Sequence, residues 1–215
     1  MATMTTYAYD DLPALMTRLT GDEKHDRSSA STLDVLWVLY DRILGDDDRF
    51  FLSKGHGPTA YYAVLAAKGL LDVDELDGFG SWDSRLGYHP DRVLAPGVEL
   101  SSGSLGHGLA IATGAALTMA GGRRVFCLVG DAELDEGSNW EAVQWAGRIG
   151  LETLNVVAVD NRSATYGWPG GIEKRFELEG WTAVRADGRD HDELEAAFRA
   201  ADGEHPHLVV AEVRR

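Results

Sequence analysis

The chain has 215 residues, of which 44% are hydrophobic and 26% are charged, a composition typical of a globular protein with a substantial core. Its formal net charge of −15 argues against nucleic acid or an anionic membrane as a partner. No apolar run approaches the roughly 18 residues of a membrane span, and the N-terminus does not resemble a signal peptide. The single cysteine, Cys127, allows no intrachain disulfide, so we expect a cytoplasmic protein.

The first hundred residues are predicted to be mainly helical. Helical spacing runs from about 10–20, and apolar residues at i, i+3, i+4 and i+7 predict an amphipathic helix over 32–43. Residues 50–57 are predicted to form a loop, and 58–68 a helix with proline in its first turn. Residues 72–100 are expected to be mostly irregular.

The second half alternates between predicted helices and strands. A helix rich in glycine and alanine is predicted over 105–119, and short apolar runs predict buried parallel strands over 125–129 and 155–159. The remaining elements are a helix over 138–149, a strand over 181–185, a helix over 190–200 and a strand over 208–213. This alternation predicts an α/β fold with a mostly parallel sheet and helices on both faces. We expect residues 1–215 to form a single domain with an N-terminal helical extension.

Polar residues follow both central strands directly. Asp131 lies in the segment 130–137 after the first strand, and Asn161 follows the second. Ligands bind at the carboxyl ends of such strands, so both side chains are expected to meet one cation. A carboxylate, an amide oxygen and a nearby backbone carbonyl suit Mg²⁺ or, as an alternative, Ca²⁺. The competing interpretation is that Asp131 is a turn residue and that Asn161 merely ends a strand.

Four histidines lie in loops, and three of them have a glycine within two residues. They are His25, His56, His89 and His107. Taken singly, each is typical of a solvated surface position, but together they indicate recognition of phosphate and hydroxyl groups by side chains that titrate near neutral pH. An acidic protein that binds an anionic diphosphate also needs local positive potential, which a divalent cation and helix N-termini would supply.

Taken in order, these motifs resemble the thiamine-diphosphate motif in its transketolase version. Typical members read LSKGHG, GSLGQG, GDGELNEG and VDxN, and the matching segments here are 52–57, 103–108, 130–137 and 159–161. Residues 25–40 also resemble the family's HPGGSLSAADILAALY. The resemblance covers nearly the whole chain and implies the thiamine-diphosphate-binding fold, specifically its diphosphate-binding (PP) domain.

The resemblance also implies roles for individual residues. The Mg²⁺ ligands would be Asp131, Asn161 and the backbone carbonyl of Ser163. The contacts to thiamine diphosphate would come from His56, Gly103, Leu105, Gly130, Ala132 and Asn161. His25 and His89 would hold the donor hydroxyls and assist proton transfers. Glu136 would face the partner's active site across an interface.

Several positions depart from the family pattern. Ala132 replaces a glycine, and residues 26–28 replace the usual Pro-Gly-Gly. Ala164 and Tyr166 stand where Gln and Asp are usual, and relatives continue beyond the equivalent of Arg215 into a loop rich in Lys and Gly. We therefore expect a substrate specificity that differs from that of ordinary sugar-phosphate transketolases.

The function implied by the resemblance is that of one component of a two-component transferase. Such an enzyme moves a two-carbon ketol unit from a phosphorylated ketose to an acceptor. A second polypeptide would carry the pyrimidine-binding domain, in an α₂β₂ assembly outside which the chain is inactive. One alternative is a protein similar to the α subunit of 2-oxoacid dehydrogenases, which passes the unit to a lipoyl or acyl carrier protein. A lesser alternative is a non-catalytic binding subunit.

Overall fold

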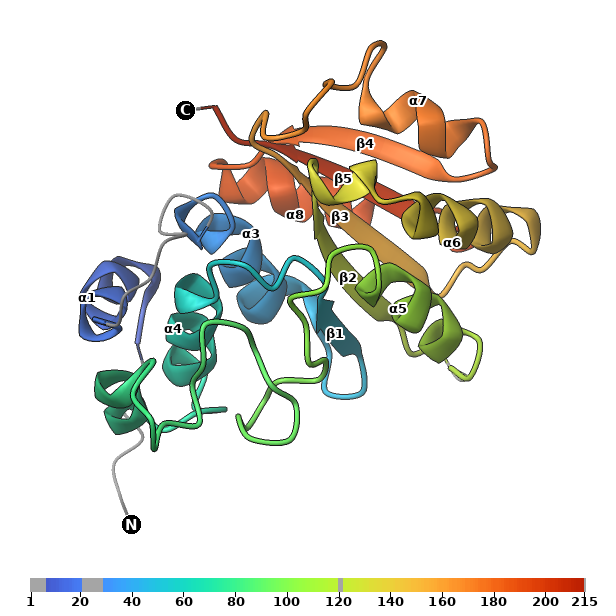
Figure 1. The fold of residues 1–215 in the computed structure, drawn as a ribbon. Coiled ribbons are helices and arrows are strands. Elements are labelled where there is room, and N and C mark those ends of the chain that lie inside the picture. Colours follow the sequence, from blue (N-terminus) through green and yellow to red (C-terminus); the bar gives the residue numbers. More distant parts are fainter. Residues whose placement is uncertain (1–6, 21–28, 120–121, 215) are drawn as a thin grey trace.

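A computed structural model describes residues 7–20, 29–119 and 122–214, and it is organised around one five-stranded sheet (Figure 1). The strand order is β1-β2-β3-β5-β4, and every neighbouring pair is parallel. The strands are β1 (Arg49–Leu52), β2 (Val125–Gly130), β3 (Leu154–Asp160), β4 (Thr182–Asp187) and β5 (His207–Glu212). The predicted α/β class with a parallel sheet is confirmed.

Strand β1 corrects one prediction. A loop is predicted over 50–57, but residues 50–52 belong to the edge strand of the sheet, with Arg49 opposite Val125 and Leu52 opposite Leu128. The strand has four residues, and the last three are all buried. So short a run shows no alternation of polar and apolar residues, and for this reason its pattern does not identify a strand. The loop begins at Ser53.

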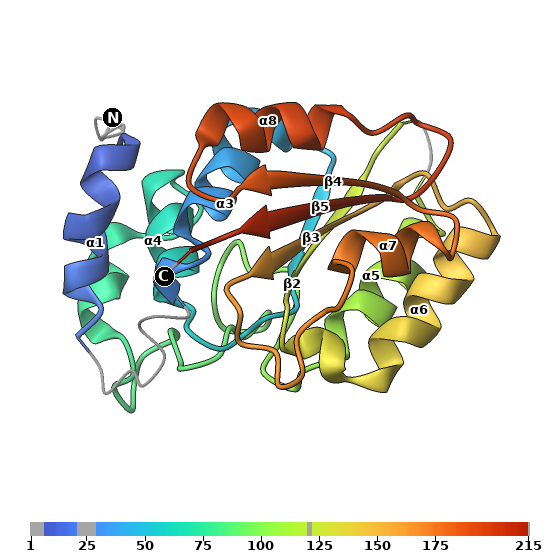
Figure 2. The same ribbon diagram turned by 90° about the horizontal axis from the view of Figure 1, so that it is seen from above.

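Two layers of helices cover the two faces of the sheet (Figure 2). One hydrophobic cluster joins one face to α3 (Leu33–Val38), α4 (Thr59–Ala67) and α8 (His191–Arg199), and α1 (Leu12–Arg18) packs outside α4. The other cluster joins the opposite face to α5 (Gly108–Ala116), α6 (Gly137–Arg148) and α7 (Ile172–Glu177). Successive strand residues point to opposite faces, so Cys127 belongs to one cluster and Leu128 to the other. Helices on both faces are confirmed.

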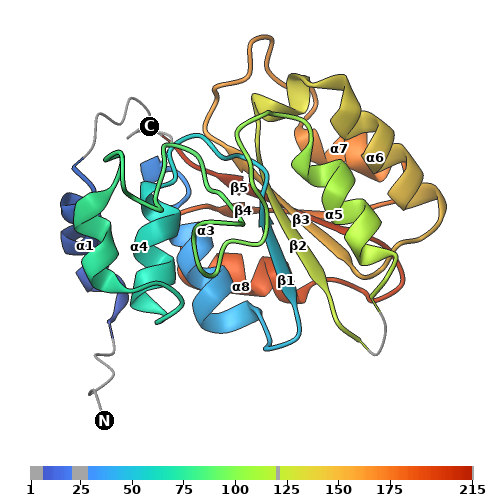
Figure 3. The same cartoon turned by 60° about the horizontal axis from the view of Figure 1, so that its bottom comes forward.

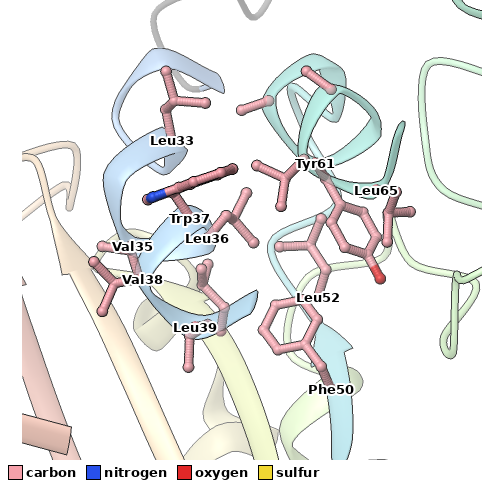
Figure 4. Close-up of a cluster of buried hydrophobic side chains, with 14 of the residues drawn as sticks. Leu33, Val35, Leu36, Trp37, Val38, Leu39, Phe50, Leu52, Tyr61 and Leu65 are labelled. Atoms are coloured by element: carbon pink, nitrogen blue, oxygen red, sulfur yellow. The ribbon is translucent and has the colours of Figure 1, made fainter. Parts of the chain in front are cut away.

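Helix α3 packs between the sheet and α4 (Figure 4). Leu36, Phe50 and Tyr61 are at most 1% exposed in this cluster. The helix continues as a π-helical segment over Leu39–Ile43, so the predicted extent to residue 43 is confirmed. Helix α7 was not predicted, because six residues show too little periodicity.

The segment between α4 and α5 is irregular, as expected, apart from a 3₁₀ helix over Val73–Gly78. It runs past the β1 edge of the sheet (Figure 3). There the carboxylate oxygen Oε2 of Glu99 lies 3.8 Å from Nη1 of Arg49, the first residue of the edge strand. In the described part of the chain, no helix combines the length and apolar character that crossing a membrane requires.

Candidate functional site

The carboxyl ends of β2 and β3 bring the two predicted cation ligands to one edge of the sheet. Gly130 pairs with Val159, and the backbone N–H of Asp131 donates to the carbonyl of Val159 at 3.0 Å. After Asn161 the chain turns sharply at Arg162, which has φ +59°, an uncommon conformation for a residue other than glycine. This turn directs the following residues back toward Asp131.

The carboxylate of Asp131 is held by that returning loop. Asp131 is 1% exposed, and its Oδ2 accepts hydrogen bonds from the backbone N–H groups of Ser163 at 2.7 Å and Ala164 at 3.0 Å. Its Oδ1 accepts a hydrogen bond from the Ser163 hydroxyl at 2.6 Å. We call residues 161–171 the cation loop. Three of its donors fix both oxygens of one buried carboxylate.

Asn161 completes a donor set that fits a divalent cation. Its Nδ2 donates to Ser31 Oγ at 3.2 Å, while its buried Oδ1 has no hydrogen-bond partner among the described residues. Buried polar atoms nearly always have a partner, so this oxygen is suited to a ligand. No cluster of three or more His, Cys, Asp or Glu side chains forms within residues 7–20, 29–119 and 122–214. The candidate set instead combines one carboxylate with neutral oxygens, which suits Mg²⁺.

A buried glutamate that was not predicted as a site residue connects three loops. Glu133 is 1% exposed; its Oε1 accepts hydrogen bonds from Ser53 Oγ at 2.5 Å and the Gly106 N–H at 3.1 Å, and its Oε2 accepts one from the Gly130 N–H at 3.3 Å. These donors lie after β1, before α5 and at the end of β2. Burial raises the pKa of Glu133, although its donors act against this shift. Glu133 therefore holds together the loops that carry three of the four motifs.

Lys54 lies beside this network and is 8% exposed. Burial lowers the pKa of Lys54 to about 8, while the nearby carboxylates of Glu133 and Asp131 act in the opposite direction. A Cβ on Gly130 would lie 3.0 Å from Lys54 Cδ, so glycine leaves room for the lysine. Lysine at this point adds positive potential next to the predicted diphosphate position. The signal in the sequence is its place in the segment 52–57, which matches the family's LSKGHG.

Two of the predicted histidines meet in space. The rings of His56 and His89 are perpendicular, with centroids 4.7 Å apart. Gly103 has φ +132°, and a Cβ there would lie 2.7 Å from His89 Cδ2. Gly55 approaches Ser102 in the same way, and Ser102 Oγ is a second buried polar atom without a partner among the described residues. The loops therefore converge closely enough that only glycine fits at these contacts.

The other predicted residues are distributed around the same edge. Leu105 is half-buried. The next residue, Gly106, packs closely against Glu136, since a Cβ on Gly106 would lie 2.7 Å from Glu136 Cβ. The Glu136 side chain itself is exposed. Ala132 has φ −69° and ψ −30°, so alanine in place of the family's glycine causes no backbone strain. His25 lies outside the described residues.

The fold and site define a class of protein: a parallel α/β protein with an oxygen-rich candidate cation site and glycine-rich loops at the carboxyl edge of the sheet. A family described as the thiamine diphosphate binding domain of transketolase matches residues 39–214. The match takes in most of the chain, which therefore belongs to this family.

Individual relatives agree with this assignment. The chain is 52% identical, over 98% of its length and 74% of the other, to a protein of Rhodococcoides fascians named Ferredoxin fas2. It is 33% identical to one subunit of the apulose-4-phosphate transketolase of Actinobacillus succinogenes, over 87% of this chain and 75% of that one. It is 32% identical to the 6-deoxy-6-sulfo-D-fructose transketolase subunit SqwG of a Clostridium strain, over 82% and 71%.

The word ferredoxin in the name of the first relative has no counterpart in this chain. Ferredoxin iron–sulfur clusters are held by several cysteine thiolates. This chain has Cys127 alone, and that residue is buried in β2. Its own cysteines therefore cannot hold such a cluster.

Solved structures show the same architecture. The transketolase from Leishmania mexicana superposes with a TM-score of 0.80 at 25% identity, over 97% of this chain and 37% of that one. The transketolase from Campylobacter jejuni gives a TM-score of 0.72 at 22% identity, over 95% of this chain and 37% of that one, which shows the shared fold. The chain thus spans little more than a third of these transketolases.

The comparisons bear on three predictions made from the sequence. The predicted fold is confirmed, and so is the predicted place among thiamine-diphosphate-dependent transferases of the transketolase family. Two relatives are named as individual subunits of transketolases, which agrees with the predicted split enzyme.

Proposed function

We propose that the chain is the diphosphate-binding component of a two-component transketolase-like enzyme, which moves a two-carbon ketol unit from a phosphorylated ketose to an acceptor. The observation that carries the proposal is the site at the ends of β2 and β3. There the buried carboxylate of Asp131 lies with an Asn161 Oδ1 that has no partner among the described residues. The family match supports thiamine diphosphate as the cofactor of this site. Relatives named as single transketolase subunits support a divided enzyme.

In this proposal, Mg²⁺, or Ca²⁺ in its place, is held by Asp131, Asn161 and the Ser163 carbonyl. The cofactor contacts are His56, Gly103, Leu105, Gly130 and Ala132, together with Asn161. When bound, thiamine diphosphate supplies the carbon nucleophile and the electron sink of the reaction.

The chain's own side chains then have separate tasks. Asp131 contributes the one negative charge of the cation set, and Lys54 adds positive potential beside it. His89, whose ring contacts that of His56, orients donor hydroxyls and assists proton transfers together with His25. Glu136 is exposed and available to a partner.

The partner in this proposal carries the pyrimidine-binding domain, in an α₂β₂ assembly. Residues 1–215 serve as one PP domain with an N-terminal helical extension. Relatives that are named as individual subunits of transketolases support a second polypeptide. A cytoplasmic location belongs to the same proposal and is supported by the single, buried Cys127.

A second candidate keeps the cofactor and changes the acceptor to a lipoyl or acyl carrier protein. The observation in its favour is Tyr166, which is 89% exposed in the cation loop where the family usually has Asp. An exposed aromatic side chain beside the site suits contact with another macromolecule. The nature of the acceptor separates the two candidates.

The test is to purify the chain in complex with its complementary polypeptide and to measure transfer from ketose phosphates to aldose phosphates and to lipoyl or acyl carriers. Asp131→Asn should abolish Mg²⁺-dependent cofactor binding and transfer, whereas Asp47→Asn, an exposed aspartate before β1, should leave both unchanged. Transfer to a carrier alone would establish the second candidate. A complex that binds thiamine diphosphate without any transfer would indicate the non-catalytic subunit.

A further inference from the structure

Two tryptophans contact the turn that follows β2. The indole Nε1–H of Trp168, in the cation loop, donates to the backbone carbonyl of Asp131 at 3.2 Å. The Nε1–H of Trp140, in α6, donates to the carbonyl of Leu134 at 2.8 Å. Both carbonyls belong to the turn over residues 131–136. Two separate parts of the chain therefore contact the same turn through the same kind of donor.

The two indoles also contact each other and a shared cation. The ring centroids of Trp140 and Trp168 are 5.5 Å apart, with an interplanar angle of 52°. The guanidinium of Arg175, in α7, lies 5.0 Å from the Trp168 ring centroid and 5.6 Å from that of Trp140. Both distances are within the range of cation–π attraction. We call Trp140, Trp168 and Arg175 the indole clamp.

The cation loop depends on such contacts because it has little apolar material of its own to bury. The loop already donates hydrogen bonds to the Asp131 carboxylate. In addition, the backbone N–H of its Thr165 donates to Asp135 Oδ2 at 3.1 Å. Tyr166 is 89% exposed, and Gly167 has φ +65°. Thr165 is exposed as well. The loop is therefore docked by polar contacts to the turn, and one of these contacts is the hydrogen bond from the indole of Trp168.

We propose that Trp168 is a positioning residue, which through the indole clamp holds the cation loop against Asp131 so that Asn161 and Ser163 are in place before the cation arrives. The inference rests on the proposed function for the identity of the ligand. Its physical basis is preorganisation: a loop that is already docked loses less conformational freedom when the ligand binds. Trp168 acts through the carbonyl of Asp131, which is the residue whose carboxylate would hold the cation.

The first test measures loop docking in the full chain without any cofactor. Trp168→Phe removes the N–H donor and keeps an aromatic ring for the stack. We expect the amides of Ser163, Ala164 and Thr165 to exchange with deuterium about fivefold faster, as for the loss of one hydrogen bond. Trp82→Phe makes the same change at a tryptophan that is 99% exposed and should not alter these rates. Unchanged exchange in Trp168→Phe would overturn the proposal.

The second test measures Mg²⁺ affinity in the assembled enzyme at saturating thiamine diphosphate. Trp168→Phe should raise the apparent Kd about fivefold, and Trp140→Phe, which removes the donor to Leu134, should change it in the same direction. Faster exchange with unchanged Mg²⁺ affinity would refute the positioning role. If the wild-type complex binds neither cation nor cofactor, the proposed function fails, whereas the exchange rates still decide whether the clamp docks the loop.

Discussion

Asp131 illustrates how one residue becomes a site through its neighbours. Its buried carboxylate accepts hydrogen bonds from the backbone N–H and the hydroxyl of Ser163 and from the backbone N–H of Ala164. Such neutral donors position a carboxylate while leaving its charge for a cation. Asn161 could be predicted as its companion because both follow strand ends. Glu133 could not, because Ser53, its closest donor, lies 80 residues away in the chain.

The buried pair of Glu133 and Lys54 gives a prediction at this scale. Glu133→Gln should lower the free energy of unfolding by about 1–3 kcal/mol, because Lys54 loses its compensating charge and the acceptor for Ser53 is weakened. Chemical denaturation measures the change, with Glu141→Gln on the exposed side of α6 as the control. Adding Lys54→Met should restore part of the loss. A double variant as unstable as the sum of the two single variants would rule out the coupling.

At the scale of elements, α5 contains two glycines in opposite environments. A Cβ on Gly108 would lie 2.3 Å from Ser53 Oγ and 2.7 Å from Ser53 Cα, whereas a Cβ on Gly114 would meet nothing within 4 Å. Gly108→Ala should therefore destabilise the protein by about 1–3 kcal/mol, because the loop after β1 must move. Gly114→Ala should stabilise it by about 0.5–1 kcal/mol, because alanine is the better helix former.

Thermal or denaturant unfolding of both variants checks this pair, and each variant is the control for the other. Equal changes in the free energy of unfolding for the two substitutions would show that the close packing of α5 against Ser53 does not contribute to stability. Cofactor binding gives a second measurement, since Ser53 donates to the network around Glu133. Only the Gly108 variant should weaken it.

His207 connects β5 to its neighbours and predicts a pH dependence. It is 1% exposed, its Nε2 donates to the Ala197 carbonyl at 2.9 Å, and its Nδ1 lies 2.8 Å from Thr182 Oγ1. Burial lowers the pKa of His207 below its ordinary value, so the folded protein resists protonation. The unfolded chain then binds more protons as the pH falls below about 6.5, and stability is lost in that range.

We therefore expect the free energy of unfolding to fall between pH 7 and pH 5, and His207→Gln to flatten part of this slope. Above pH 7, both forms of the protein should show no dependence that comes from this residue. Denaturant titrations across the pH range measure the difference, and His205→Gln provides a control because His205 is exposed. An identical slope in the wild type and the His207 variant would contradict the assignment.

At the scale of the whole molecule, a chain with a net charge of −15 must bind an anionic diphosphate. In the proposed function, a bound cation and the buried Lys54, rather than a basic surface, supply the positive potential that the diphosphate needs. Ligand binding to the folded state should therefore stabilise the assembled enzyme only when Mg²⁺ and thiamine diphosphate are both present. At about 100 times the Kd, the gain is roughly 2.7 kcal/mol. EDTA or Asp131→Asn should abolish it, as measured by the shift in Tm; stabilisation that survives EDTA would contradict the cation site.

The amino-acid sequence by itself was sufficient to predict the class of fold, most helices and strands, and Asp131 and Asn161 as a pair of candidate cation ligands. These features depend on local periodicity and on motifs placed at strand ends, and both can be recognised within short windows. The edge strand β1, the network around Glu133 and the indole clamp were decided by the tertiary structure alone. Each depends on contacts between segments far apart in the chain, and such contacts exist only once the parallel sheet has brought its strand ends together.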